Sequence, residues 1–187
     1  MPRPPRPQIA GGIYHLISRG DRREPVYLDA NDFELFLALV GTSVKRYGWT
    51  CLAYCLMPNH YHLLVKTEDS NVSAGMHRLN SCYAHAFNDR YGLVGHLFQS
   101  RFSAFVVESE AYLLGVARYI VLNPVRARLC RSAGEWRWSS YAATAGWVRP
   151  RPCLSVAPLL EQFGTSKERA RLEYEAFVQE GAAELGA

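Results

Sequence analysis

The stretch Met57-Pro58-Asn59-His60-Tyr61-His62-Leu63-Leu64-Val65 decides how the centre of this chain folds. Proline and asparagine separate two runs rich in apolar residues, which predicts a turn between two strands. We expect these strands over residues 50–56 and 60–66. The short break between them favours a β-hairpin.

The two histidines of this stretch share one face of the second strand. Side chains two positions apart in a strand point the same way, so His60 and His62 project together. Neutral imidazole is the commonest metal-ligand side chain, and the pair can hold one metal ion. Histidines that are simply buried or exposed give the same spacing, so the pair alone leaves both interpretations open.

The hydrophobic pattern around the hairpin predicts further elements. A strand is expected over residues 13–18, then a helix capped by Asp29 or Asn31 that ends at Tyr47-Gly48. A second helix begins at Asn71 or Ser73, runs to about residue 89 and ends at Tyr91-Gly92. A fourth strand covers residues 102–107. The third helix is capped by Ser109 and ends near Pro124.

The resulting order is β-α-β-β-α-β-α, which indicates an α+β fold with a ferredoxin-like antiparallel sheet. We expect helices on one face of that sheet and a C-terminal helical extension, with a helix over residues 167–180. The predicted organisation is a disordered Pro/Arg tail at residues 1–8, one domain at 9–145 and the extension at 146–187.

Composition narrows the class of protein. The 187 residues are 49% hydrophobic and 20% charged, which allows a packed core. No apolar run approaches the ~18 residues of a membrane span, and the N-terminal residues do not resemble a signal peptide. We therefore expect a cytoplasmic protein without membrane contact. The five cysteines contain no Cys-x-x-Cys pair, so they are expected to be reduced.

Positive charge is concentrated in one segment. Residues 118–151 contain seven arginines and a single acidic residue, Glu135, although the whole chain carries only +4. Such an excess favours a phosphate-rich partner such as nucleic acid. A general preference for arginine over lysine, which this chain also shows, is the alternative.

The third helix carries a second group of candidate residues, Tyr119 and Asn123. They lie four positions apart and share a helix face, so a phenol and an amide oxygen are presented together. The amide can complete a metal site and the phenol can attack phosphorus. A half-buried aromatic and a helix-ending asparagine before Pro124 would look the same.

Five blocks in order resemble the single-tyrosine transposases of the HUH superfamily, and most closely their REP-associated branch. The blocks span about 130 residues and comprise Tyr14-His15-Leu16-Ile17-Ser18-Arg19-Gly20, Leu56 to Val65, Leu97-Phe98-Gln99-Ser100-Arg101-Phe102, Tyr119-Ile120-Val121-Leu122-Asn123-Pro124-Val125-Arg126-Ala127 and Trp138-Ser139-Ser140-Tyr141. Tyrosine between His60 and His62 fits the family's His-hydrophobe-His form. The residues beyond Ala145 inherit nothing specific.

The resemblance implies roles for four residues. His60, His62 and Asn123 would bind a divalent cation, Mg²⁺ or Mn²⁺, and Tyr119 would be the nucleophile. The family cuts single-stranded DNA near hairpins and rejoins it through a 5′-phosphotyrosine. Residues 9–145 would form this transposase domain. His15 can approach Tyr119 as a base, although a structural role is equally open.

DNA contacts are expected from arginines and aromatic residues near these blocks. Arg126 and Arg128 follow the catalytic helix and can contact phosphates. Arg101 and Phe102 can bind and stack an unpaired base. The loop with Arg19 and Arg22 can touch DNA or water. Further stacking candidates, each of which can instead anchor the C-terminal segment, are Trp136, Trp138 and Tyr141.

Three functions compete at this stage. The first is a metal-dependent transposase acting on single-stranded or hairpin DNA as a monomer or homodimer. The second is a domesticated hairpin-DNA-binding protein with little or no cleavage activity. The third is a small-molecule metallohydrolase, which leaves Tyr119 and the arginines unexplained. All four positions that the chemistry needs are filled, which favours the transposase.

Overall fold

The computed structural model describes residues 8–185, and the expected tail at residues 1–8 lies almost wholly outside this range. The strands are β1 (Ile13–Arg19), β2 (Trp49–Met57), β3 (His60–Thr67) and β4 (Ser103–Val106). The α-helices are α1 (Ala30–Tyr47), α2 (Val72–Tyr91), α3 (Glu110–Arg126), α4 (Tyr141–Thr144), α5 (Ala157–Leu160) and α6 (Lys167–Ala183). Short 3-10 turns cover Asp21–Arg23, Ala133–Glu135 and Glu161–Phe163.

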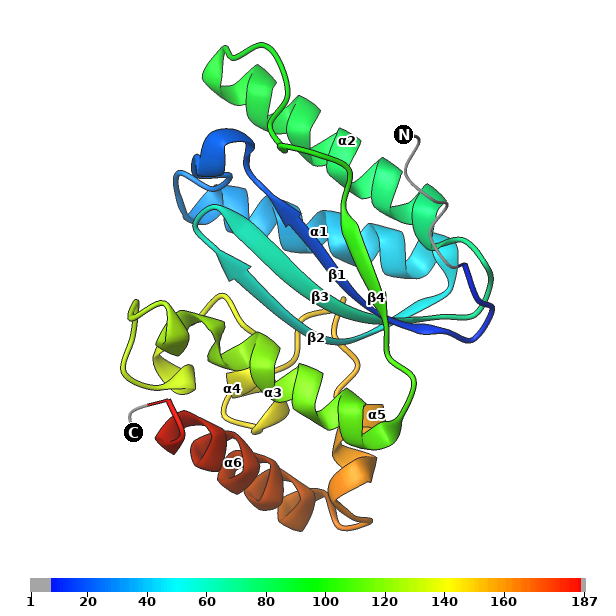
Figure 1. The fold of residues 1–187 in the computed structure, drawn as a ribbon, viewed down its shortest axis with the longest axis vertical. Coiled ribbons are helices and arrows are strands. Elements are labelled where there is room, and N and C mark those ends of the chain that lie inside the picture. Colours follow the sequence, from blue (N-terminus) through cyan, green and yellow to red (C-terminus); the bar gives the residue numbers. More distant parts are fainter. Residues whose placement is uncertain (1–7, 186–187) are drawn as a thin grey trace.

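The four strands form one antiparallel sheet in the order β2-β3-β1-β4 (Figure 1). The predicted α+β, ferredoxin-like arrangement is therefore confirmed, including the hairpin of β2 and β3, whose turn consists of Pro58 and Asn59. Each long element lies within a few residues of its predicted bounds. No helix in the described part of the chain has the length and apolar character to cross a membrane.

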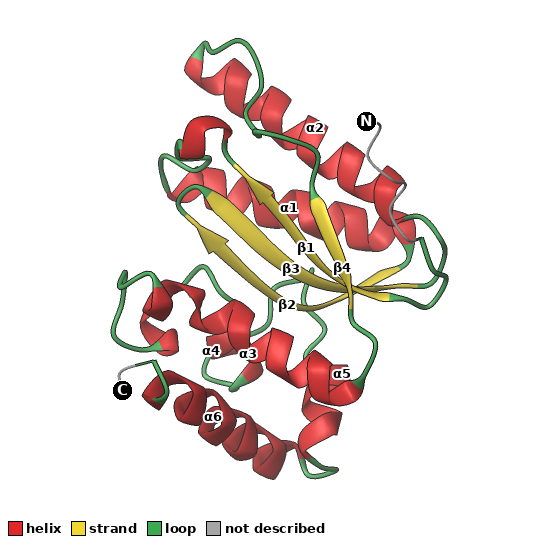
Figure 2. Ribbon diagram, in the orientation of Figure 1, coloured by secondary structure: helices red, strands yellow, loops and turns green. Residues whose placement is uncertain are grey.

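Helices cover both faces of the sheet rather than the single face expected (Figure 2). Helices α1 and α2 pack on the face that carries Tyr61, Leu63 and Val65. Helix α3 and the C-terminal helices pack on the face that carries Leu64. The central strands β1 and β3 are apolar on both sides, which requires cover on both sides.

Local sequence signals explain where the helices begin and end. Asp29 caps α1, and its side chain accepts hydrogen bonds from the backbone N–H groups of Asn31 and Asp32 in a capping box. Asn71 stands at the start of α2 but does not cap it with its side chain. Its amide instead accepts from Trp49 Nε1 (2.8 Å) and donates to the Tyr47 carbonyl (2.8 Å).

Helix α3 continues two residues past Pro124, where the sequence predicted its end. A proline inside a helix leaves the carbonyl four residues earlier, here that of Ile120, without its N–H partner. The Asn123 side chain compensates, because its Nδ2 donates to the Tyr119 carbonyl (2.9 Å) and approaches the Ile120 carbonyl (3.5 Å).

The C-terminal extension belongs to the same packed body as the sheet. Tyr174 and Val178 of α6 are buried with Ile120 of α3 in the core on this face. Arg118 of α3 places its guanidinium 4.4 Å from the centre of the Phe177 ring. The proposed boundary at residue 145 stays a prediction, and the extension braces the outer side of α3.

Gly75 of α2 packs against the Trp49 side chain of β2, and a Cβ atom at position 75 would lie 2.1 Å from Cζ2 of Trp49. We expect Gly75→Ala to lower the free energy of unfolding by about 1–3 kcal/mol through overpacking. Gly115→Ala in α3 is the matched control, since its Cβ would meet no atom within 4 Å. It should raise stability by up to about 1 kcal/mol, because alanine favours helix. Urea unfolding of both variants gives the measurement, and equal effects would contradict this packing.

Candidate active site

The hairpin strand β3 brings His60 and His62 to the face of the sheet that α3 covers. Their ring centres lie 5.1 Å apart. His62 is buried and His60 is partly exposed. Tyr61 between them points to the opposite face, where its hydroxyl donates to Asn80 Oδ1 (2.5 Å). A tyrosine is tolerated in this buried position because its hydroxyl has that partner.

Strand β1 adds a third histidine to the group. His15 is buried, and its ring stacks on that of His62 with centres 5.1 Å apart. Nε2 of His15 lies 2.9 Å from Nδ1 of His62, which is hydrogen-bonding distance. The β1–β3 register produces this contact, because it pairs His15 with Leu64, two positions from His62.

The three imidazoles are neutral at physiological pH. Burial lowers the pKa of His15 to about 4. Burial, together with nearby Arg19, lowers the pKa of His60 to about 4. Burial and the neighbouring His15, His60 and Arg19 lower the pKa of His62 to about 2. A neutral imidazole keeps the lone pair that a metal ion needs.

Helix α3 presents Tyr119 to this group from above. Its ring centre lies 5.7 Å from that of His62 and 6.0 Å from that of His15, both edge-on. Tyr119 is 40% exposed, unlike the histidines beneath it. The guanidinium of Arg126 lies 5.3 Å from the centre of the phenol ring. Tyr119 and Arg126 are therefore exposed to a large substrate, whereas His15 and His62 are buried and His60 is only partly exposed.

Asn123 follows Tyr119 by about one turn of α3 and is almost fully buried. Its amide nitrogen is engaged by the helix backbone, which leaves Oδ1 as the atom available to another partner.

The histidine pair meets one structural test for a metal site. Nε2 of His62 is a buried nitrogen without a hydrogen-bond partner among the described residues. Such an orphan is unusual in a folded protein and calls for a ligand. No group of three or more His, Cys, Asp or Glu side chains within residues 8–185 is arranged to hold a metal ion. A third protein ligand would therefore be of another kind, such as an amide oxygen.

The other arginines predicted to contact DNA differ in their relation to the histidines. Arg19 is paired with His60 across the sheet and affects its pKa, so it belongs to the site. Arg22 is exposed in the turn that follows β1. Arg128 follows α3 with a positive φ of 57° and is exposed. Their contacts with DNA stay predictions.

Arg101 and Phe102 line a cavity of about 690 Å³ between α2 and the segment before β4. Arg101 is exposed, but Phe102 is only 6% exposed and packs in the core on the α2 face. Any stacking by Phe102 would therefore come from the cavity side.

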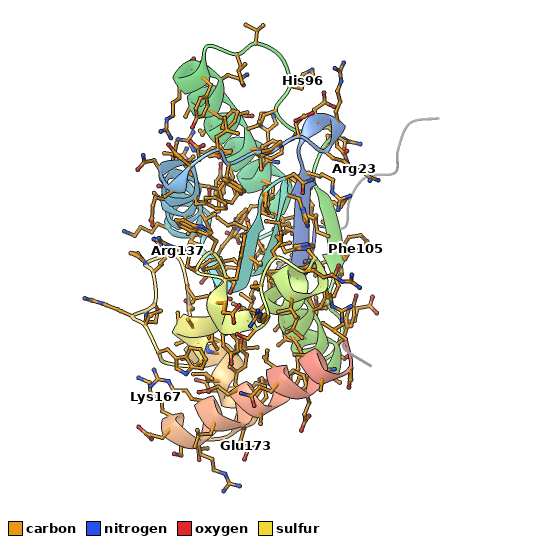
Figure 3. The ribbon with its side chains drawn as sticks, turned by 90° about the vertical axis from the view of Figure 1, so that its left-hand side faces the viewer. Arg23, His96, Phe105, Arg137, Lys167 and Glu173 are labelled. Carbon is orange, nitrogen blue, oxygen red and sulfur yellow. The ribbon has the colours of Figure 1, made fainter. Side chains whose placement is uncertain are left out.

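The arginine-rich segment is dispersed rather than gathered around Tyr119. Arg151 pairs with Glu34 (2.8 Å), and Arg137 lies over Trp138 at 4.4 Å. Figure 3 places Arg137 across the molecule from Phe105, whose ring lies 6.1 Å from that of His15. Charge counting along the sequence missed these separate structural roles. Of the arginines in residues 118–151, Arg126 is the one that contacts the Tyr119 ring.

Three aromatic residues of the same segment that were candidates for base stacking have structural contacts. Trp138 is buried and stacks on Phe33 with ring centres 4.4 Å apart. Trp136 donates its Nε1–H to the Leu56 carbonyl (3.0 Å), and Tyr141 is buried against Tyr174. They anchor the C-terminal segment to the sheet, which was the alternative to base stacking.

Comparison with known proteins identifies the family. The model of the IS200-like transposases matches residues 9–123, more than half of the chain. No curated protein matches the chain. A REP-associated tyrosine transposase, solved bound to a REP hairpin, is similar in fold, with a TM-score of 0.67 and 19% identity over 80% of this chain and 89% of that one. A candidate transposase from Deinococcus radiodurans matches with a TM-score of 0.45 and 19% identity, over 63% of this chain and 95% of that one.

The family match begins before β1 and ends at Asn123, so it contains the histidine pair, His15 and Tyr119. The chain belongs to the family of IS200-like transposases.

Proposed function

We propose that this protein cuts and rejoins single-stranded DNA beside hairpin repeats through a covalent bond between Tyr119 and a 5′-phosphate. The main observation behind this proposal is the position of the exposed Tyr119 over the buried His62. Their ring centres lie 5.7 Å apart, and Nε2 of His62 has no hydrogen-bond partner among the described residues. The similar REP-associated transposase is bound to a REP hairpin, which supports hairpin DNA as the substrate here.

His60, His62 and Asn123 would hold a divalent cation, Mg²⁺ or Mn²⁺, through imidazole nitrogens and an amide oxygen. When bound, such a cation supplies a Lewis acid for the scissile phosphate. Burial of the two histidines keeps them neutral and fixed, so they are prepared for a ligand.

The covalent step exchanges one phosphate ester for another. Tyr119 Oη attacks phosphorus and forms a new O–P bond, while the bond from phosphorus to the 3′-oxygen breaks. The phenol proton ends on the released 3′-hydroxyl. A 3′-hydroxyl from a different strand can reverse the step, because the phosphotyrosine keeps the ester bond. The reaction therefore needs no nucleoside triphosphate as an energy source.

Arg126 and Arg19 have distinct tasks in this proposal. Arg126 lies over the phenol ring and stabilises negative charge that develops on its oxygen. Arg19 lies beside the histidines, where it can contact the scissile phosphate. Arg22, Arg101 and Arg128 are exposed and can hold the DNA backbone farther away.

The first test is formation of a covalent adduct. Labelled single-stranded DNA carrying a hairpin repeat from the flanks of the gene is mixed with protein and Mn²⁺ or EDTA. We expect an SDS-stable protein–DNA adduct only with Mn²⁺, and its loss in Tyr119→Phe.

Tyr112→Phe is the matched control, because Tyr112 is exposed on the same helix, two turns earlier. This variant should form the adduct at the wild-type rate. Tight hairpin binding without adduct under any metal would instead support the domesticated DNA-binding protein.

The second prediction concerns the histidines. His60→Gln should weaken Mn²⁺ binding, measured by electron paramagnetic resonance without DNA, by about 100-fold, since a ligand matters at least as much as its supporting contacts. His85→Gln, an exposed histidine on α2, is the control and should bind as wild type does. Unchanged affinity in His60→Gln would exclude it as a ligand.

The third prediction concerns Arg126. At saturating hairpin DNA, Arg126→Gln should slow adduct formation about 2–5-fold, because Arg126 is exposed and a cation over an aromatic ring contributes about 0.5–1 kcal/mol at exposed sites. Arg169→Gln removes the same charge from the outer helix α6 and should leave the rate unchanged. Equal rates in the wild type and the Arg126 variant would mean that this guanidinium does not assist the phenol.

A further inference from the structure

A hydrogen bond between His15 and His62 contains one proton, which belongs to one of the two facing nitrogens. Nε2 of His15 and Nδ1 of His62 are 2.9 Å apart in a buried contact. One nitrogen must donate and the other must accept. Two arrangements are therefore possible, and they have opposite consequences for the far side of the His62 ring.

In the first arrangement His62 donates from Nδ1 and His15 accepts. A neutral imidazole carries one proton, so Nε2 of His62 then keeps its lone pair. In the second arrangement His15 donates, and the proton of His62 moves to Nε2. That nitrogen is buried without a partner among the described residues, and a proton there closes it to any cation.

The tautomer of His60 is fixed by the neighbouring side chain of Asn59. Asn59 donates from Nδ2 to the Arg23 carbonyl (2.9 Å), so its Oδ1 faces His60 Nδ1 at 2.7 Å. An amide oxygen only accepts, and His60 must therefore donate from Nδ1. The lone pair of His60 is left on Nε2. The two histidines can act on one ligand with equivalent atoms only if His62 adopts the same tautomer.

We propose that His15 is a positioning residue, which accepts the Nδ1 proton of His62 and so keeps the Nε2 lone pair of His62 available to a divalent cation. This inference rests on the proposed function, because it takes His60 and His62 as ligands of one cation. A contact of this kind fixes both the tautomer and the orientation of a ligating imidazole.

The fold holds His15 in place for this task. His15 is 7% exposed on the central strand β1, between β3 and β4. Its ring centre lies 6.0 Å from that of Tyr119, in an edge-to-face arrangement, and 6.1 Å from that of Phe105. Its Nδ1 is not among the buried polar atoms that lack a partner, so a proton on this nitrogen is compatible with the surroundings.

The test compares two variants of the full chain. Gln at position 15 can place an amide oxygen near the site of Nε2 and accept the same proton, whereas Phe keeps a ring but accepts nothing. Mn²⁺ affinity is measured by electron paramagnetic resonance without DNA. We expect His15→Phe to bind about 10–100-fold more weakly and His15→Gln to stay within about threefold of wild type. Thermal unfolding shows whether each variant is folded.

A second readout uses the wild-type chain and needs no variant. Long-range ¹H–¹⁵N spectra with Mg²⁺ report which nitrogen of each histidine is protonated. We expect protons on Nδ1 of His62 and Nδ1 of His15. A proton on Nε2 of His15, or a cation bound to His15 itself, would overturn the inference even if the Phe variant did not fold.

The outcomes separate the two proposals. Equal Mn²⁺ affinity in wild type and a folded His15→Phe overturns the role of His15 but leaves the proposed function intact. A wild-type chain that binds no Mn²⁺ overturns both. Weak binding by both His15 variants, with both folded, would mean that the imidazole itself is needed and that proton acceptance is not its role.

Discussion

The pairing of β1 with β3 is the constraint on which the rest of the molecule depends. Seven residue pairs, from Ile13–Lys66 to Arg19–His60, fix the register of the central strands. A slip by one residue would turn His62 towards α1 and α2, and Tyr61 towards α3. The hydrogen-bonded chain from Tyr61 to Asn80 and on to Ser18 resists such a slip. The strand pairing and hydrogen bonds that stabilise the core thus also direct the histidine side chains to the face under α3.

The second constraint is the position of α3, which carries the phenol. Its apolar side packs on β2 and β3, and α6 packs on its outer side. Arg118 ties the two helices together through Phe177 and approaches Glu184 at 3.9 Å. The C-terminal extension thus has a structural role: it holds α3, and with it Tyr119, in position over the sheet.

Local signals in the sequence predicted the elements well, because capping, turns and periodicity act within a few residues. Asp29, Gly48 and Gly92 stand where the pattern expected them. Three features escaped prediction, because capping, turn and periodicity signals do not report the contacts on which these features depend. Cover on both faces follows from the apolar side chains on both sides of β1 and β3. The Asn123 side chain supports α3 past Pro124 by its bond to the Ile120 carbonyl, and the arginines are dispersed by distant partners such as Glu34. The contact of His15 with His62 likewise appears only once β1 and β3 are paired.

The site divides its tasks between buried and exposed groups for a physical reason. Imidazoles held under α3 lose their solvation, which keeps them uncharged and leaves lone pairs rather than protons. A phenol in the same place would be buried as well, whereas Tyr119 at the helix surface is 40% exposed. Arg126 places positive charge at the phenol ring, whereas the positive charge of Arg19 lies beside His60 and His62 and helps to lower their pKa values.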